Sequence, residues 1–311
     1  MRFPRPLKTG GTVLLAAPSS PLTARQPVQA IAAAVEKLGF RVRIGESCLC
    51  SPASSGYAAA PAEVRAADLN QGFADPEIDA IWCVRGGSSA WQLLPLLDYP
   101  CIAAHPKPLI GFSDITTLLL ALRQRCGLVT FHGPTANRVP DWVEQDGFSW
   151  RSLRAAMELC GCLPIENPPG EPIRSLRPGR ARGILTGGNL SLVTQTLGTP
   201  EQIDARGCIL YLEDVGEAVY ALERMLNQLL RAGILGQAAG LVFGDFTDCR
   251  NAYAPDYGPE ALLRDFFAGW PQPVLYNLRS AHCSPMVTLP MGAVCTIDGD
   301  RGTMAVNRGN G

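Results

Sequence analysis

Short apolar runs alternate with helical segments along the first 132 residues, and this alternation limits the fold more than any other feature. Runs with strand character lie at 12–17, 40–44, 78–84, 107–110 and 128–131. Helix signals fill the intervals, at 29–38, from 61 through 69, through 91–97 and at 114–123. Strands and helices that alternate in this way predict a parallel sheet covered by helices on both faces. We therefore predict an α/β fold with an N-terminal doubly wound domain.

The segment 163–180 interrupts this pattern, because its prolines and glycines disfavour helix and central strand. We interpret it as a linker between a domain at 1–162 and a second domain at 181–311. A chain of 311 residues that is 47% hydrophobic is long enough to bury two cores. The second domain contains a predicted helix at 217–231 and predicted strands at 208–212, 241–243 and 274–278. Beyond residue 285 the pattern predicts hairpins, with strands at 286–289, 293–297 and 303–306.

Composition excludes several classes of function. A net charge of −1 with 18% charged residues offers no electrostatic footprint for nucleic acid or an anionic membrane. No apolar run approaches the roughly 20 residues of a membrane helix, and the N-terminal residues predict no secretory signal. No nucleotide-binding glycine motif is present, and neither C-x-C pair has the partners of a zinc site, so we expect no cofactor and no metal. The 11 cysteines favour free thiols in a reducing cytoplasm.

The strand, turn and helix around Ser113 form the most informative local pattern. Gly111 tolerates backbone angles that other residues resist, and Asp114 favours the first turn of a helix. A serine at such a junction projects its hydroxyl beyond the sheet edge, beside N–H groups that can receive a developing negative charge. This is the geometry of a nucleophile elbow, although Ile115 stands where a small residue is usual. The local pattern alone favours a simpler role for Ser113 as a helix cap.

A serine nucleophile needs a base, normally a histidine that a carboxylate orients. The chain has three histidines, and His282 is the best candidate because it lies in a polar loop after an apolar strand. Glu213 is the best carboxylate, because it ends an apolar strand where an acid has no packing role. Glu213 could instead cap the turn that follows it, and His282 could be an ordinary loop histidine. Gly86 and Gly87 could form an oxyanion hole or a plain tight turn, and locally the turn is favoured.

Taken together, these segments resemble the LD-carboxypeptidase family, the serine peptidases that include muramoyl-tetrapeptide carboxypeptidase and the microcin-C self-immunity proteins. No single piece is specific, but six pieces occur in the family's order between about residues 12 and 292. The pieces are Arg-Gly-Gly at 85–87, Gly-Phe-Ser-Asp at 111–114, Phe-His-Gly-Pro at 131–134, Gly-Gly-Asn-Leu at 187–190, Leu-Glu-Asp-Val-Gly-Glu at 212–217 with Tyr220 and Arg224, and His282 before Leu-Pro-Met-Gly at 289–292.

The resemblance implies a Ser-Glu-His triad: Ser113 as nucleophile, His282 as general base and then acid, and Glu213 as the orienting carboxylate. Glu217 is the second choice for that carboxylate. The oxyanion hole would be the backbone N–H of Asp114 and of the 86–87 loop. The resemblance also implies a smaller C-terminal α/β domain carrying Glu213 and His282, a site in the cleft between the domains, no metal, and a homodimer. Candidates for contact with the substrate are Ser88, Asn189 and His132.

Two positions depart from the family's pattern. Ser88 and Ser89 replace the usual Tyr-Gly after Arg-Gly-Gly, which bears on the substrate pocket and the oxyanion loop. Ala281 replaces the usual glycine before the histidine, and even a displacement of about 1 Å can cost roughly a hundredfold in rate.

We expect a cytoplasmic serine carboxypeptidase that releases terminal D-Ala from murein tetrapeptide through an acyl-enzyme on Ser113, in peptidoglycan recycling. The alternatives are a peptidase of the microcin-immunity type that cleaves an aminoacyl- or peptidyl-nucleotide amide, and a non-catalytic binding homologue.

Overall fold

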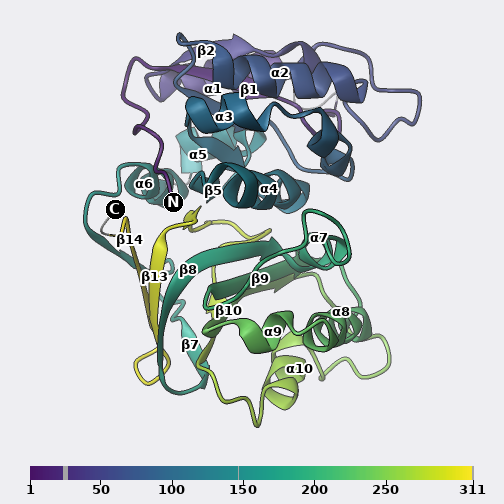
Figure 1. The fold of residues 1–311 in the computed structure, drawn as a ribbon, viewed down its shortest axis with the longest axis vertical. Helices are drawn as coiled ribbons and strands as arrows, with labels where there is room; N and C mark the ends of the chain where they lie inside the picture. The colour runs from purple at the N-terminus through teal and green to yellow at the C-terminus, as the bar shows by residue number, and fades with distance from the viewer. Residues whose placement is uncertain (24–26, 146, 310–311) are drawn as a thin grey trace. The chain divides into compact units, whose positions relative to one another are not determined.

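The computed structural model describes residues 1–23, 27–145 and 147–309, which form two compact units (Figure 1). The first unit comprises Met1–Glu158 together with Thr288–Pro290, and the second comprises Leu159–Val287 with Met291–Gly311. None of the helices in the described ranges combines the length and the apolar character that a bilayer crossing requires.

A six-stranded sheet organises the first unit. Its order is β12-β5-β4-β3-β1-β2, and the pairings among β1 to β5 are all parallel. The strands are β1 (Thr12–Ala16), β2 (Arg41–Ile44), β3 (Ala80–Cys83), β4 (Leu109–Gly111), β5 (Thr130–His132) and β12 (Leu289–Met291). The α/β class and the parallel sheet predicted from the alternating pattern are confirmed.

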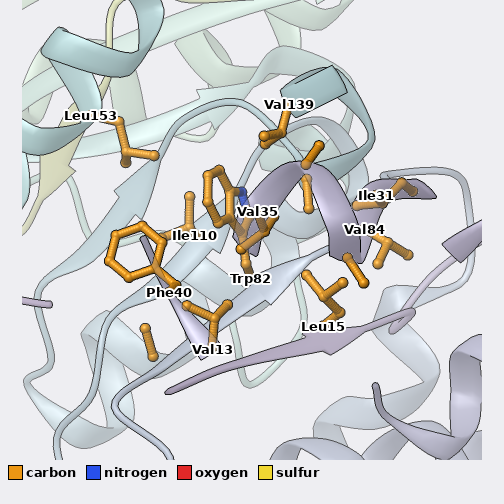
Figure 2. Close-up of a cluster of buried hydrophobic side chains, with 14 of the residues drawn as sticks. Val13, Leu15, Ile31, Val35, Phe40, Trp82, Val84, Ile110, Val139 and Leu153 are labelled. Carbon is orange, nitrogen blue, oxygen red and sulfur yellow. The ribbon is translucent and has the colours of Figure 1, made fainter. Parts of the chain in front are cut away.

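Helices cover both faces of this sheet, because successive side chains of a strand point to opposite sides. Val13 and Leu15 of β1 belong to one hydrophobic cluster, whereas Leu14 and Ala16 belong to the other. Figure 2 shows the first of these clusters around the fully buried Trp82. The helices of the unit are α1 (Val28–Lys37), α2 (Ala62–Ala74), α3 (Tyr99–Ala104), α4 (Thr116–Cys126), α5 (Val139–Gln145) and α6 (Gly147–Met157). The doubly wound arrangement is therefore confirmed.

Two predicted elements differ from the structure. The segment around Trp91 is a 3-10 helix, η2 (Ala90–Leu96), because Pro95 inside it cannot donate the hydrogen bond that an α-helix requires. The run at 286–289 does not begin a hairpin. Instead, β12 (Leu289–Met291) pairs beside β5 in the first unit's sheet, more than 150 residues after the other strands of that sheet.

An eight-stranded mixed sheet organises the second unit, with the order β6-β14-β13-β8-β9-β10-β11-β7. Strands β8 to β11 run parallel, and the flanking strands pair antiparallel. The proline-rich segment 163–180 supplies β6 and β7, which take the two edges, where a missing N–H is tolerated. The strands are β6 (Cys162–Ile165), β7 (Arg174–Arg177), β8 (Arg180–Asn189), β9 (Ile209–Val215), β10 (Gly240–Thr247), β11 (Val274–Leu278), β13 (Val294–Asp298) and β14 (Thr303–Asn307).

The second unit's helices connect its parallel strands. The longest, α8, buries Val219, Leu222, Leu226 and Leu229, which share one face at helical spacing. Its helices in the described residues are α7 (Leu190–Gln195), α8 (Val219–Arg231), α9 (Ile234–Gln237) and α10 (Pro259–Phe266).

Candidate active site

Ser113 lies at the junction between β4 and α4, where the backbone turns sharply. Its φ is +63°, one of three positive values among the non-glycine residues that the structure describes. A serine in this left-handed region costs on the order of 1–3 kcal/mol, and such strain concentrates at functional sites. The cap positions fall on Phe112 for the 3-10 turn η3 (Ser113–Ile115) and on Ile115 for α4, so Ser113 is not the cap residue. The backbone geometry therefore favours the elbow interpretation over the cap.

The loop after β3 approaches this turn very closely. A Cβ atom placed on Gly86 would lie 2.8 Å from the Cβ and 3.0 Å from the Oγ of Ser113. Gly87 has φ +147°, and a Cβ there would collide with Ser20. A side chain at either position would displace the loop, so Gly86 allows the backbone to approach Ser113 and Gly87 allows it to pack against Ser20.

A carboxylate and an imidazole meet in the second unit. His282 donates from Nδ1 to Glu213 Oε2 at 2.9 Å. Glu213 lies on β9 and is fully buried, and the His282 side chain is 15% exposed. Gly244 of β10 makes room beside Glu213, because a Cβ on it would lie 3.0 Å from that of Glu213.

Burial shapes the electrostatics of this pair. It raises the pKa of Glu213 above the ordinary value for a glutamate, because the charged form loses its hydration, and the hydrogen bond and positive charge of His282 oppose that rise. Burial also raises the pKa of Glu217, with the negative charge of Asp214 adding to the effect. A fully buried carboxylate gains most from a cationic partner, so Glu213 is suited to stabilise an imidazolium.

The loop that carries His282 is held at its base. Val287 donates its backbone N–H to Arg279 O at 2.6 Å. The Arg279 N–H donates to Asn167 Oδ1 at 2.8 Å, and its guanidinium donates to Asp245 Oδ2 at 2.6 Å. Ala281 is fully buried within this loop, and with alanine there His282 still reaches Glu213.

The other predicted residues occupy different environments. Ser88 is exposed in the loop after β3. Asn189 is buried and caps α7 by accepting from Leu192 N, while its amide donates to Asp214 at 2.9 Å. His132 is buried, with its ring edge-on to Phe112 at 6.1 Å between centroids. Substrate contact by any of them stays a prediction.

Sequence reasoning missed one structural feature beside Ser113, the hydrogen bonding of the Asp114 side chain. We expected this residue to serve a helix N-terminus and to offer its backbone N–H. Its carboxylate is buried and accepts three hydrogen bonds from two neighbouring loops. The sequence signal was available, because an acid next to a serine in an otherwise apolar segment needs polar partners once buried.

A strained serine at a strand–helix junction in one unit and a histidine paired with a buried carboxylate in the other are each typical of serine-type hydrolases. Comparison with known proteins narrows that class. The family model described as LD-carboxypeptidase N-terminal domain matches residues 13–133, and that described as LD-carboxypeptidase C-terminal domain matches residues 182–297. The chain belongs to the LD-carboxypeptidase family.

Relatives match over nearly the whole chain. The probable murein peptide carboxypeptidase of Bacillus subtilis is 36% identical, with 98% of this chain and 94% of that protein covered. The murein tetrapeptide carboxypeptidase of Pseudomonas aeruginosa is 35% identical, with 94% of each covered. The microcin C7 self-immunity protein MccF of Escherichia coli is 27% identical, with 97% and 94% covered. A solved MccF structure in complex with aspartyl sulfamoyl adenosine superimposes with a TM-score of 0.90 at 24% identity, covering 99% of this chain and 98% of that one.

Proposed function

We propose that the protein is a serine carboxypeptidase that releases terminal D-Ala from murein tetrapeptide in peptidoglycan recycling. The contact between His282 and the fully buried Glu213 carries the proposal, because a buried acid on an apolar strand has no packing role and suits an orienting one. The names and the 35–36% identity of two relatives support the substrate. The scissile bond would be the amide between an L-configured centre of the diamino acid and D-Ala.

In the proposed mechanism, Ser113 Oγ attacks the carbonyl carbon of the scissile amide. His282 takes the hydroxyl proton through the ring nitrogen that does not face Glu213, and Glu213 stabilises the imidazolium that forms. The backbone N–H of Asp114 and those of Gly86 and Gly87 would donate to the oxyanion. The imidazolium then returns the proton to the leaving amine of D-Ala, and water hydrolyses the acyl-enzyme with His282 again as base.

Ser88 is the best placed of the proposed substrate contacts, because it is exposed on the loop that carries the oxyanion glycines. Asn189 and His132 are buried, so their contribution would be to hold neighbouring groups. We further propose a cytoplasmic homodimer. Eleven free cysteines fit a reducing compartment, and the family resemblance supports the dimer, which light scattering of the purified protein tests.

A second candidate keeps the chemistry and changes the substrate to an aminoacyl- or peptidyl-nucleotide amide. Its support is the similarity to MccF, whose solved structures include a complex with aspartyl sulfamoyl adenosine. The stronger similarity to the murein carboxypeptidases favours the first candidate.

The test measures D-Ala released from disaccharide-tetrapeptide and from free tetrapeptide by wild type and by Ser113→Ala. Wild-type release that the variant lacks supports both the substrate and the nucleophile. Ser88→Ala would retain release with an altered KM, since its hydroxyl is assigned to binding alone. No release by wild type would refute the murein substrate, and hydrolysis of an aminoacyl sulfamoyl adenosine would then favour the second candidate. A protein inert to both substrates and to a fluorophosphonate at Ser113 would be the non-catalytic homologue.

A further inference from the structure

The Asp114 carboxylate connects three loops that follow adjacent strands of the first unit's sheet. Asp114 follows β4, Ser89 and Ala90 follow β3, and Ser19 follows β1. Oδ2 of Asp114 accepts from Ser19 Oγ at 2.5 Å and from the backbone N–H groups of Ser89 and Ala90, each at 2.8 Å. All three hydrogen bonds thus converge on one oxygen atom at the carboxyl edge of the sheet.

These hydrogen bonds are shielded from water. Asp114 is 1% exposed, and both Ser19 and Ser89 are completely buried. A hydrogen bond to a buried charged group contributes about 1.5–3 kcal/mol, roughly twice the contribution of a neutral one. Removing the carboxylate would leave two buried N–H groups and a hydroxyl without their acceptor, so the loops would have to rearrange.

Arg65 holds the same loop from its other side. Its guanidinium, 1% exposed, donates to Pro18 O at 2.8 Å, to Ser89 O at 3.1 Å and to Ser89 Oγ at 3.2 Å. Ser89 is therefore fixed at its backbone N–H by Asp114 and at its carbonyl and hydroxyl by Arg65. The segment between β3 and Ser89, which contains Gly86 and Gly87, has little freedom to move.

The precision of this loop matters because Gly86 lies against Ser113, with no room for even a methyl group between them. We propose that the Asp114 side chain is a positioning residue that sets the Gly86–Gly87 N–H groups relative to the Ser113 hydroxyl. The inference rests on the proposed function, in which those groups receive the oxyanion. The backbone N–H of Asp114 is a separate contribution, which substitution of the side chain does not delete.

The test follows Ser113 directly and needs no knowledge of the natural substrate. A fluorophosphonate is attacked at phosphorus by Ser113 Oγ, the P–F bond breaks, fluoride leaves, and the hydroxyl proton passes to the base. Its rate depends on the same oxyanion donors as amide cleavage. We expect Asp114→Ala to lower the labelling rate, and kcat for D-Ala release, by about a hundredfold, with KM changed less than about threefold.

Asp68 provides a matched control in the same unit. It lies on α2, is 8% exposed, and accepts the backbone N–H groups of Glu46 and Ser47, which follow β2, at 3.0 and 2.8 Å. Asp68→Ala should lower Tm as Asp114→Ala does, yet label at the wild-type rate. Asp114→Asn retains an acceptor oxygen and should recover part of the lost rate, which a merely structural role does not predict.

A folded Asp114→Ala variant that labels and turns over at wild-type rates would overturn the proposal. If that variant does not fold, Ser19→Ala decides, because it removes one of the three donors and keeps the carboxylate. We expect labelling about three- to tenfold slower, and a wild-type rate would overturn the proposal. Wild type that labels readily and releases no D-Ala would refute the murein substrate alone, since the labelling comparison still tests the role of Asp114.

Discussion

Glu213→Gln removes the negative charge beside His282 while keeping the size of the side chain. The structure gives the scale of the effect. Nδ1 and Oε2 lie 2.9 Å apart, so the charge centres of an imidazolium and a carboxylate would be separated by about 4 Å. At an effective dielectric constant of about 20, opposite unit charges at that separation attract by about 4 kcal/mol. Each 1.36 kcal/mol corresponds to a factor of ten in rate, so we expect kcat to fall by roughly a thousandfold.

The assay is D-Ala release under saturating tetrapeptide, with KM measured alongside and folding checked by circular dichroism. KM should change little, because the imidazolium forms only during the reaction, not on binding. Glu217→Gln tests the competing carboxylate and should retain kcat within about threefold. A Glu213→Gln variant within tenfold of wild type would refute the reasoning. A large loss in Glu217→Gln with none in Glu213→Gln would transfer the orienting role to Glu217.

Three further predictions concern the same elements. Gly86→Ala, whose methyl group would overlap Ser113, should slow fluorophosphonate labelling about a hundredfold, whereas Gly161→Ala, with open space around it, should not. Trp82→Phe should lower the free energy of unfolding in urea by about 2 kcal/mol, because it leaves a void in the core and the Pro134 carbonyl without its donor. The half-exposed Trp91 gives the matched control Trp91→Phe, and equal losses in the two variants would contradict this prediction. Burial raises the pKa of Glu213, so ionisation of this carboxyl lowers the stability of the fold as pH rises through that pKa. Glu213→Gln should therefore raise Tm by more at pH 8 than at pH 5. An equal gain in Tm at both pH values would contradict this prediction.

The parallel sheet of the first unit could be predicted because its signals are local. Strands β1, β3 and β4 are short apolar runs, helix signals fall between the strands, and topology rules then leave few arrangements. The α4 helix follows directly from the spacing of Ile115, Leu118 and Leu122, all of which are buried.

The strand β12 could not be predicted in its place. It has only three residues, and its pairing with β5 depends on contacts between segments more than 150 residues apart. A short apolar run close to two genuine hairpin strands, β13 and β14, carries no local signal that distinguishes a third hairpin strand from an addition to a distant sheet. The proline-rich segment had a similar ambiguity, because proline excludes a central strand but allows the edge positions that β6 and β7 take.

The candidate site likewise combines a feature with a local sequence signal and a contact between distant segments. The sequence places Ser113 at a strand–helix junction, yet a helix cap and a nucleophile share that pattern, and it is the backbone angle of +63° and the cap positions that favour the elbow. Glu213 and His282 are 69 residues apart in the chain, so their contact follows from the order of strands β9, β10 and β11 and not from spacing.

Ser89 illustrates why a departure from a family motif has no fixed meaning until its surroundings are known. From the sequence, Ser88 and Ser89 in place of the usual Tyr-Gly bear on both the substrate pocket and the proposed oxyanion loop. In the structure the Ser89 side chain is completely buried and accepts from Arg65, while its backbone N–H reaches Asp114. The Ser89 hydroxyl accepts a hydrogen bond from the Arg65 guanidinium, and a glycine at this position would lack that acceptor. The Ser89 side chain therefore bears on the rigidity of the loop, and among these two positions only Ser88 is exposed, which agrees with its proposed contact with substrate.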